Sequence, residues 1–267
     1  MQITGKTFVI TGAGSGMGRE LTLEILRRGG SVAGVDVRKE QLDETLALAK
    51  QAGGTMAPFV LDITDAKAVA ALPAAIAKKL GPVDGLINNA GIIQPFVKIN
   101  DLDIAAAEKV MNVNFYGPLR LIKAFLPGLL ERPVAHILNV SSMGAYAPVP
   151  GQSLYGASKA AIKLLTEGLR SELLDTNVGV TVVFPGATAT NIAANSGMTE
   201  MTADSADAAK FPQTPADVAA TMMVDAIEKN TPRLTTGKDA MTMDILTRLN
   251  PVWAAGVIYK QMKSLLS

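Results

Sequence analysis

The sequence contains no cysteine and only one histidine, His136. Disulfide bonds and thiolate metal sites are therefore excluded, and we expect no metal site. A chain without cysteine is typical of a reducing compartment, and the first residues show no basic and apolar leader. No uncharged apolar run reaches the ~18 residues of a membrane span. The sequence thus predicts a cytoplasmic protein with no transmembrane segment.

Neither sign of charge predominates, because 25 lysines and arginines are balanced by 24 aspartates and glutamates. A balanced charge gives no electrostatic reason for binding nucleic acid or an anionic surface. Four tyrosines and one tryptophan do not suggest stacking on bases. We expect no nucleic-acid partner.

Segments typical of strands and helices alternate along almost the whole chain. Strands are expected at about 6–11, 31–36, 55–61, 83–88, 134–140, 180–184 and 233–236, and helices at about 17–28, 39–51, 65–80, 104–130, 153–176 and 215–229. This alternation predicts an α/β fold, a Rossmann-like doubly wound parallel sheet of about seven strands with helices on both faces. The length fits one domain, 1–267.

A glycine-rich turn lies between the first expected strand and helix. Gly12, Gly16 and Gly18 allow backbone N–H groups at a helix N-terminus to approach a pyrophosphate. Asp36 ends the next strand, 24 positions after Gly12, near the ~20-residue interval expected of a carboxylate that binds the adenosine ribose. The pattern favours a dinucleotide site.

Tyr155 and Lys159 are spaced i, i+4 on an expected helix and therefore share one of its faces. A nearby ammonium lowers the pKa of a phenol, which would suit Tyr155 to exchange a proton with an alcohol. Ser142 follows a strand at its carboxyl end, where α/β sheets bind ligands.

Taken together, these motifs resemble the short-chain dehydrogenase/reductase family in order and spacing. The same resemblance includes Asn88-Asn89-Ala90-Gly91, Asn114 and Pro185-Gly186, and it covers roughly residues 5–230. It implies a catalytic set of Asn114, Ser142, Tyr155 and Lys159. It also implies cofactor contacts from Gly12, Ser15, Gly16, Met17, Gly18, Asp36, Asp62, Asn88, Ala90, Gly91, Tyr155, Lys159, Pro185, Gly186 and Thr190.

Two of these positions have alternative interpretations. Asp36 favours NAD over NADP because it would repel a 2′-phosphate, whereas Arg38 close behind it could attract one. Asp62 could contact the adenine or could cap the following helix together with Thr64. We expect NAD, with NADP possible.

The resemblance implies hydride exchange between NAD(P) and a secondary alcohol or ketone. Ser142, Met143, Tyr155 and Met198 would contact the substrate, and the apolar surroundings predict a neutral compound such as a cyclic, aromatic or steroid-like one. The alternative is a non-catalytic dinucleotide-binding module that senses redox state.

Two segments lie outside the regular alternation. Residues 187–213 correspond to the substrate lid of the family, and 240–267 form a helical extension with Leu246, Leu249, Trp253 and Val257 at helical spacing. That face could pack on the domain or, as an alternative, touch a lipid interface. Family members usually pair through two long helices, here about 104–130 and 153–176, so we expect a homo-oligomer, either a dimer or a tetramer.

Overall fold

The computed structural model describes residues 1–190, 192–196 and 213–263. Its centre is one sheet of seven strands in the order β3-β2-β1-β4-β5-β6-β7, with every pair parallel. The strands are β1 (Thr7–Thr11), β2 (Ser31–Asp36), β3 (Thr55–Val60), β4 (Gly85–Asn88), β5 (Ala135–Val140), β6 (Val178–Pro185) and β7 (Arg233–Thr236). The predicted Rossmann-like fold is confirmed.

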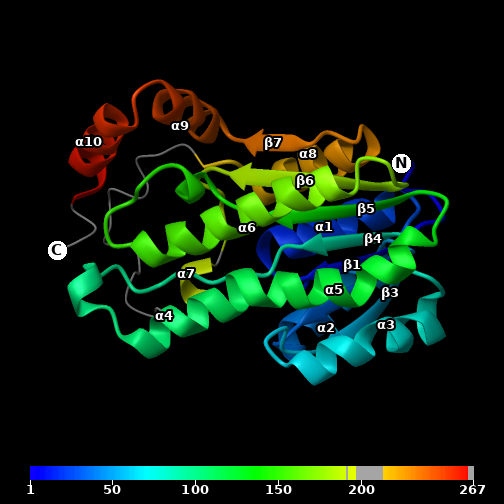
Figure 1. Ribbon diagram of the computed structural model, residues 1–267. Helices are drawn as coiled ribbons and strands as arrows, with labels where there is room; N and C mark the ends of the chain where they lie inside the picture. Colours follow the sequence, from blue (N-terminus) through cyan, green and yellow to red (C-terminus); the bar gives the residue numbers. More distant parts are fainter. Residues whose placement is uncertain (191, 197–212, 264–267) are drawn as a thin grey trace.

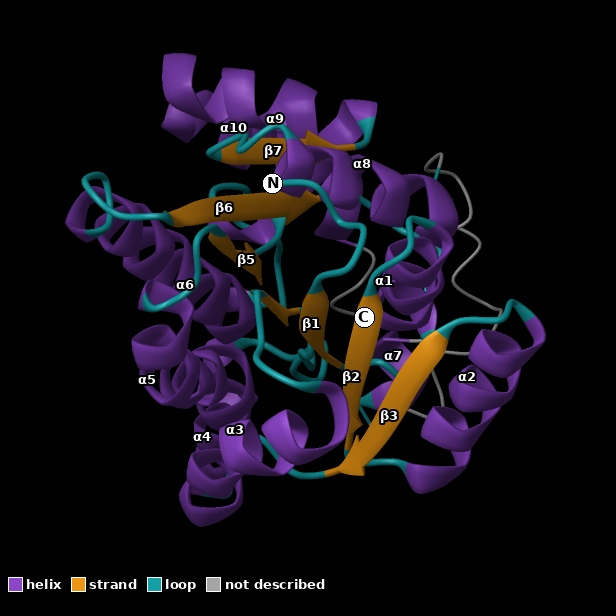
Figure 2. Cartoon of the chain, turned by 90° about the vertical axis from the view of Figure 1, so that its right-hand side faces the viewer, coloured by secondary structure: helices purple, strands orange, loops and turns teal. Residues whose placement is uncertain are grey.

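Helices cover both faces of the sheet (Figure 2). One face carries α1 (Gly16–Arg27), α2 (Lys39–Gln51) and α8 (Ala216–Glu228). The other carries α3 (Ala66–Leu80), α4 (Ile104–Met111), α5 (Gly117–Leu130) and α6 (Ser153–Glu172). The order of the strands reverses between β1 and β4. In such sheets the ligand crevice lies at this point, outside the carboxyl ends of the strands.

The two faces of the sheet bury separate apolar clusters. Leu21, Ile25 and Met223 belong to the cluster under α1 and α8, while Leu121 and Phe125 belong to the cluster under α5. Each cluster also takes side chains from the strands, because successive strand residues point to opposite faces. The central strands are consequently apolar almost throughout, as expected of a sheet covered on both sides.

The long helical region expected at 104–130 is divided by a π-helical segment, Asn112–Tyr116, between α4 and α5. Such wide turns are rare and are found frequently at functional sites. The segment contains Asn114, one of the predicted catalytic residues, whose side chain is 1% exposed.

Two helix starts differ from the expected ones. The residue that caps α3 is Asp65, whose carboxylate accepts from the N–H groups of Lys67 and Ala68, and neither Asp62 nor Thr64 takes this place. At α8 the cap position is held by Pro215, where the first residue of the helix was expected. The Asp62 carboxylate accepts from the N–H of Thr64 at 2.8 Å, and its backbone carbonyl accepts from the N–H of Asp65 at 3.0 Å.

The C-terminal extension forms two helices beyond β7, namely α9 (Lys238–Leu249) and α10 (Pro251–Met262) (Figure 1). The apolar spacing of the C-terminal extension is interrupted at Asn250-Pro251. Asn250 caps α10 through its side chain and changes the direction of the chain, so Leu249 and Trp253 are 79% and 55% exposed, whereas Ala254 and Ile258 are buried. Within the described residues, no helix is long and apolar enough to cross a membrane.

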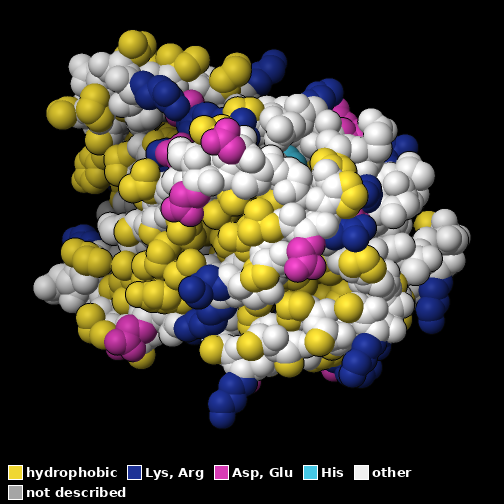
Figure 3. Space-filling view, turned by 45° about the vertical axis from the view of Figure 1, so that its right-hand side comes forward, with side chains coloured by type: hydrophobic (Ala, Val, Ile, Leu, Met, Phe, Trp, Pro, Cys, Tyr) yellow, Lys and Arg dark blue, Asp and Glu magenta, His cyan; other side chains and the backbone are white. Residues whose placement is uncertain are grey.

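Figure 3 shows where apolar side chains gather on one face of the molecule. They lie over the C-terminal helices at the upper left and across the middle of the same view. Large exposed apolar residues on the helices expected to pair include Leu164 of α6, Tyr116 next to α5 and Ile104 of α4.

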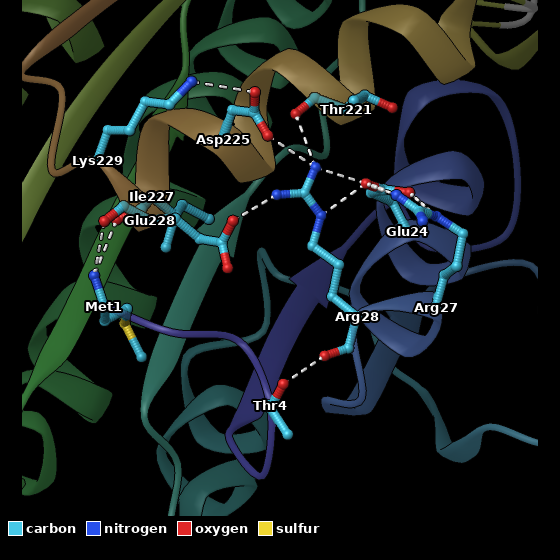
Figure 4. Close-up of polar contacts among 10 residues, drawn as sticks. All are labelled: Met1, Thr4, Glu24, Arg27, Arg28, Thr221, Asp225, Ile227, Glu228 and Lys229. Carbon is cyan, nitrogen blue, oxygen red and sulfur yellow. Dashed lines mark hydrogen bonds and ion pairs between the residues drawn. The ribbon is translucent and has the colours of Figure 1, made fainter.

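An ion-pair cluster joins α1 to α8 (Figure 4). The guanidinium of Arg28 lies 2.6 Å from Glu24, 2.8 Å from Asp225 and 2.6 Å from Glu228. Burial acts to raise the pKa of Glu24, but hydrogen bonds from Arg27 and Arg28 outweigh this effect and lower it. The cluster therefore fixes the helix that begins at the glycine-rich turn against the rest of the domain.

Candidate active site

The glycine-rich turn lies at the carboxyl end of β1 and leads directly into α1. Gly12 and Gly16 have φ angles of +69° and +51°, in the left-handed region that favours glycine. A Cβ on Gly18 would lie 1.9 Å from the carbonyl oxygen of Gly12, so this glycine is required by packing. The first turn of α1 has no side-chain cap and no acidic residue, which leaves its N–H groups available for an anion.

A cleft of about 380 Å³ extends from this turn along the carboxyl ends of β2 and β4. It is lined by most of the predicted cofactor residues, namely Gly12, Ser15, Gly16, Met17, Asp36, Asp62, Ala90, Gly91 and Thr190. Thr190 lies above the turn, because a Cβ on Gly16 would approach the Thr190 Cβ to 3.3 Å. The cleft therefore combines a glycine-rich turn with a carboxylate at the end of β2, the two features expected of a dinucleotide site.

Asp36 is held in the cleft by backbone contacts. Its two carboxylate oxygens accept from the N–H of Gly14 at 2.9 Å and from the N–H of Arg38 at 3.0 Å. The Arg38 side chain extends across the same end of the cleft and donates to the Asn195 side chain at 2.6 Å. Its Nε is buried without a hydrogen-bond partner among the described residues and lies 4.0 Å from Asp36. Acidic and basic groups thus meet where an adenosine ribose would bind.

The Asn88–Gly91 segment divides into structural and cleft-lining positions. Asn88 does not line the cleft, and its Nδ2 donates to Asn139 of β5 at 2.8 Å. The N–H of Ala90 is bound by the Thr11 hydroxyl at 3.0 Å, and Gly91 lies close to Lys159, whose Nζ would be 3.1 Å from an added Cβ. Asn88 therefore links β4 to β5, whereas Ala90 and Gly91 line the cleft.

Three of the predicted catalytic residues come together at the carboxyl end of β5. Ser142 follows that strand, and its hydroxyl accepts from the N–H of Gly144 at 3.1 Å. The first turn of α6 brings Tyr155 beside the same loop, because a Cβ on Gly144 would lie 3.4 Å from the Tyr155 ring and 3.5 Å from the Ser142 hydroxyl. Lys159 is 4% exposed, and its ammonium donates to the Val140 carbonyl at 3.0 Å.

The ionisation of these groups differs in part from the expectation. Burial raises the pKa of the Tyr155 phenol, and a hydrogen bond with Ser142 opposes this effect without cancelling it. The Lys159 ammonium lies 5.9 Å from the centre of the Tyr155 ring, and the expected lowering of the tyrosine pKa by this lysine does not outweigh burial. Burial also lowers the pKa of Lys159 to about 8, which leaves the lysine mostly protonated at neutral pH.

Asn114 completes the predicted set from the π-helical segment. Its side chain exchanges hydrogen bonds with the backbone of Ile92, both at 2.9 Å, and donates to the Ser158 hydroxyl at 3.0 Å. Ser158 in turn donates to the Tyr155 carbonyl at 2.7 Å. Asn114 therefore connects the loop after β4 to the helix that carries Tyr155 and Lys159.

Pro185 is the last residue of β6, Gly186 follows it, and neither lines the cleft. Asp239, which the sequence did not predict as a site residue, explains the glycine. A Cβ on Gly186 would overlap the carboxylate of Asp239, which accepts from the N–H of Ala187 at 2.7 Å. Tyr146, from the loop after Ser142, donates to the Ala240 carbonyl at 2.8 Å. Because Asp239 and Ala240 belong to α9, the C-terminal extension is attached to two loops of the site.

The remaining sequence predictions concern the substrate side and the histidine. Met143 is partly exposed next to Ser142, while Met198 lies outside the described residues. Gln94, in the loop after β4, is completely buried. His136 is also buried, with its Nε2 2.8 Å from the Thr181 hydroxyl, and burial lowers its pKa to about 3. Among the described residues no cluster of three metal-ligating side chains occurs.

Comparison with known proteins decides the family. The family model described as short chain dehydrogenase matches residues 6–201. The chain belongs to the short-chain dehydrogenase family. Among curated proteins it is 34% identical over 251 residues to SadH of Mycobacterium tuberculosis, a protein named as an oxidoreductase, and the match covers 92% of this chain and 91% of SadH.

Two solved structures of short-chain dehydrogenases show the same fold over nearly the full length. One, from Burkholderia phymatum in complex with NAD, has a TM-score of 0.86 at 26% identity and covers 95% of this chain and 96% of its own. The other, from Burkholderia cenocepacia in complex with NADP, has a TM-score of 0.80 at 28% identity, with coverage of 97% and 99%. Relatives of similar likeness thus bind either cofactor.

Proposed function

We propose that this short-chain dehydrogenase is an NAD(P)-dependent oxidoreductase that interconverts a secondary alcohol and a ketone. The observation that carries the proposal is the placement of Ser142, Tyr155 and Lys159 at the carboxyl edge of the sheet, adjoining the glycine-lined cleft. A module that only binds a dinucleotide has no need of a buried lysine beside a tyrosine and a serine.

The cleft fits the proposed cofactor on two observations. The positive φ angles of Gly12 and Gly16 and the uncapped first turn of α1 form a cradle for a pyrophosphate. Asp36 and Asp62 line the same cleft and offer acceptors for hydroxyl and amino groups. When bound, the nicotinamide ring supplies the acceptor or donor of hydride.

Side chains of the protein transfer the proton and bind the substrate oxygen. In the oxidation direction the hydroxyl proton passes to the Tyr155 phenolate, while the carbon-bound hydrogen leaves as hydride and the carbonyl forms. Ser142 holds the oxygen by a hydrogen bond throughout. The positive charge of Lys159 favours the phenolate and offers further N–H donors to ribose hydroxyls. In reduction the same tyrosine donates its proton to the developing alkoxide.

Finer features of the proposal rest on the described surroundings of the site. We infer a preference for NAD from the buried carboxylate of Asp36. We infer a neutral substrate because the loops that follow β4, β5 and β6 contain no charged residue up to positions 97, 151 and 196. We assign at least a dimer on the exposed apolar residues of α4 and α6. The cytoplasmic location expected from the sequence stays a prediction.

The test is turnover by the native chain and by a single hydroxyl deletion. We expect NADH to appear, followed by absorbance, when the protein and NAD are incubated with a panel of secondary alcohols. Tyr155→Phe should lower kcat by about 10²–10⁴-fold, since general acid–base catalysis is lost, with little change in the NADH dissociation constant. The matched control is Tyr259→Phe on α10, where the ring is 54% exposed. Near-native kcat in Tyr155→Phe would contradict the mechanism.

A further inference from the structure

Gln94 is a polar side chain that the proposed chemistry does not use, yet it is completely buried next to the catalytic helix. It lies in the loop that follows β4, six residues after Asn88. A buried primary amide is unfavourable unless its donor and acceptor groups are paired. The hydrogen bonds of Gln94 all lead to the start of α6, more than fifty residues further along the chain.

The Gln94 carbonyl oxygen caps α6 from outside the helix. Its Oε1 accepts from the N–H of Leu154 at 2.8 Å and from the N–H of Tyr155 at 2.9 Å. These are the second and third residues of the helix, whose N–H groups an N-cap side chain normally satisfies. The residue at the cap position, Gln152, makes no such bond. Gln94 thus replaces the missing cap.

Two further hydrogen bonds connect Gln94 to the turn that precedes α6. The Gln94 Nε2 donates to the carbonyl of Gly151 at 2.9 Å, and the Gln152 Nε2 donates to the backbone carbonyl of Gln94 at 2.8 Å. Gly151 has a φ of +76°, so the chain enters α6 through a tight turn whose carbonyl this amide holds. Four hydrogen bonds therefore connect the loop after β4 to the turn before Tyr155.

We propose that Gln94 is the positioning residue for the acid–base tyrosine, because its side chain fixes the main chain of Tyr155 itself. The inference rests on the proposed role of Tyr155. A neutral amide satisfies both N–H groups without adding a charge, whereas a carboxylate cap would oppose formation of the phenolate one turn away. The chain thereby orients Tyr155 toward Ser142 with a group that does not alter the charge of the site.

The test uses the ionisation of Tyr155, which can be measured without a substrate. Tyrosinate absorbance is titrated in each variant, and the curve of the same variant carrying Tyr155→Phe is subtracted to isolate this one phenol. In Gln94→Met both acceptor and donor are lost and the first turn of α6 is released. Because burial is what raises the pKa of Tyr155, we expect the midpoint to fall toward the ordinary value of ~10.

Gln94→Glu keeps an oxygen for the two N–H groups and is ionised in this pH range. We expect its midpoint not to fall. The matched control is Gln51→Met, an exposed glutamine at the end of α2, which should leave the midpoint at its native value. If Gln94→Met does not fold, Gln94→Asn takes its place, since the amide is one methylene too short to reach both N–H groups.

A Tyr155 titration midpoint at the native value in folded Gln94→Met or Gln94→Asn would overturn the proposal. A fall of the midpoint in Gln94→Glu as large as that in Gln94→Met would also overturn it, because the acceptor oxygen would then have no effect. With an alcohol that the native enzyme oxidises, kcat of Gln94→Met should fall by roughly 10- to 100-fold while the NADH dissociation constant stays within about twofold. If no alcohol is oxidised by the native enzyme, the proposed function fails, but the titration still decides the role of Gln94.

Discussion

We expect the choice between NAD and NADP to depend on two opposed charges at the end of β2, and the effect of each charge can be tested separately. The Asp36 carboxylate faces the ribose end of the cleft, and the Arg38 Nε lies 4.0 Å from it. A unit charge at about 4 Å contributes on the order of 4 kcal/mol at an effective dielectric constant of 20. For a 2′-phosphate near both groups, the repulsion from Asp36 and the attraction to Arg38 largely cancel.

We then expect the cofactors to be separated by the hydrogen bond that Asp36 offers to the ribose 2′-hydroxyl, which NADP lacks. Hydrogen bonds to a charged group contribute roughly 1.5–3 kcal/mol, which corresponds to about a 10- to 150-fold preference for NAD. Asp36→Asn removes the repulsion and leaves Arg38 in place, so we expect the preference to move toward NADP by at least about tenfold. Arg38→Met removes the attraction and should move the preference further toward NAD.

The assay is the dissociation constant of NADH and of NADPH, measured by nicotinamide fluorescence on each variant. Asn at position 36 presents an NH2 group to one of the two N–H groups that the carboxylate binds, which costs stability. The ratio of the two constants avoids this difficulty, because both are measured on the same folded protein. Tighter NADPH binding by the native chain, or a shift of both variants in the same direction, would refute the argument.

Two further predictions concern assembly and stability. Light scattering should show at least a dimer for the native chain and a monomer for Leu164→Glu, which places a charge on the exposed face of α6. The control Leu249→Glu on α9 should remain a dimer. A native monomer at micromolar concentration would contradict this prediction. In urea denaturation, Arg28→Ala should lower the free energy of unfolding by roughly 2–3 kcal/mol. This is below the full cost of breaking a buried ion pair, because the cluster is partly solvated. Arg27→Ala should leave the free energy of unfolding nearly unchanged, because the Arg27 side chain is 68% exposed.

The sequence was sufficient to predict the fold because each helix and strand is marked by local sequence signals. The bounds of β2, α2 and β7 agree with the expected ones, since a glycine, a proline or a change of periodicity stands at each end. The outcome could not be predicted where two local signals compete. Around Asn250-Pro251 apolar residues stand at helical spacing although a proline interrupts them, and the asparagine cap starts a new helix whose buried residues are Ala254 and Ile258.

The candidate site was predictable as far as motifs and their spacing along the chain identify its residues. The turn from Gly12 to Gly18 and the pair of Tyr155 and Lys159 can be found by spacing alone. The contact of Gln94 with the start of α6 spans about sixty residues, and no local pattern marks a side chain that caps a distant helix. The ionisation of Tyr155 was missed for a related reason, since burial is a property of the folded chain and depends on every element around it.

The last prediction concerns the charge of the substrate. The loops at the carboxyl ends of β4, β5 and β6 contain no charged residue within 89–97, 143–151 and 186–196. Arg233 of β7 is engaged elsewhere, since it pairs with Asp244 at 2.7 Å and stacks on Phe184 at 4.1 Å. Recognition of a carboxylate or phosphate normally requires an arginine or clustered positive charge, and the described residues of these loops offer none.

A substrate carboxylate placed there would lose its water without gaining a partner. Such an unpaired charge costs more than about 3 kcal/mol, which corresponds to at least ~100-fold in kcat/KM. The matched comparison is methyl 3-hydroxybutyrate against 3-hydroxybutyrate, because the two share a carbon skeleton and differ mainly in charge. We expect the ester, and neutral cyclic alcohols with it, to be oxidised in clear preference. Faster oxidation of the free acid would show that a cation does reach the pocket, and that the neutrality of these three loops does not govern which alcohols the enzyme accepts.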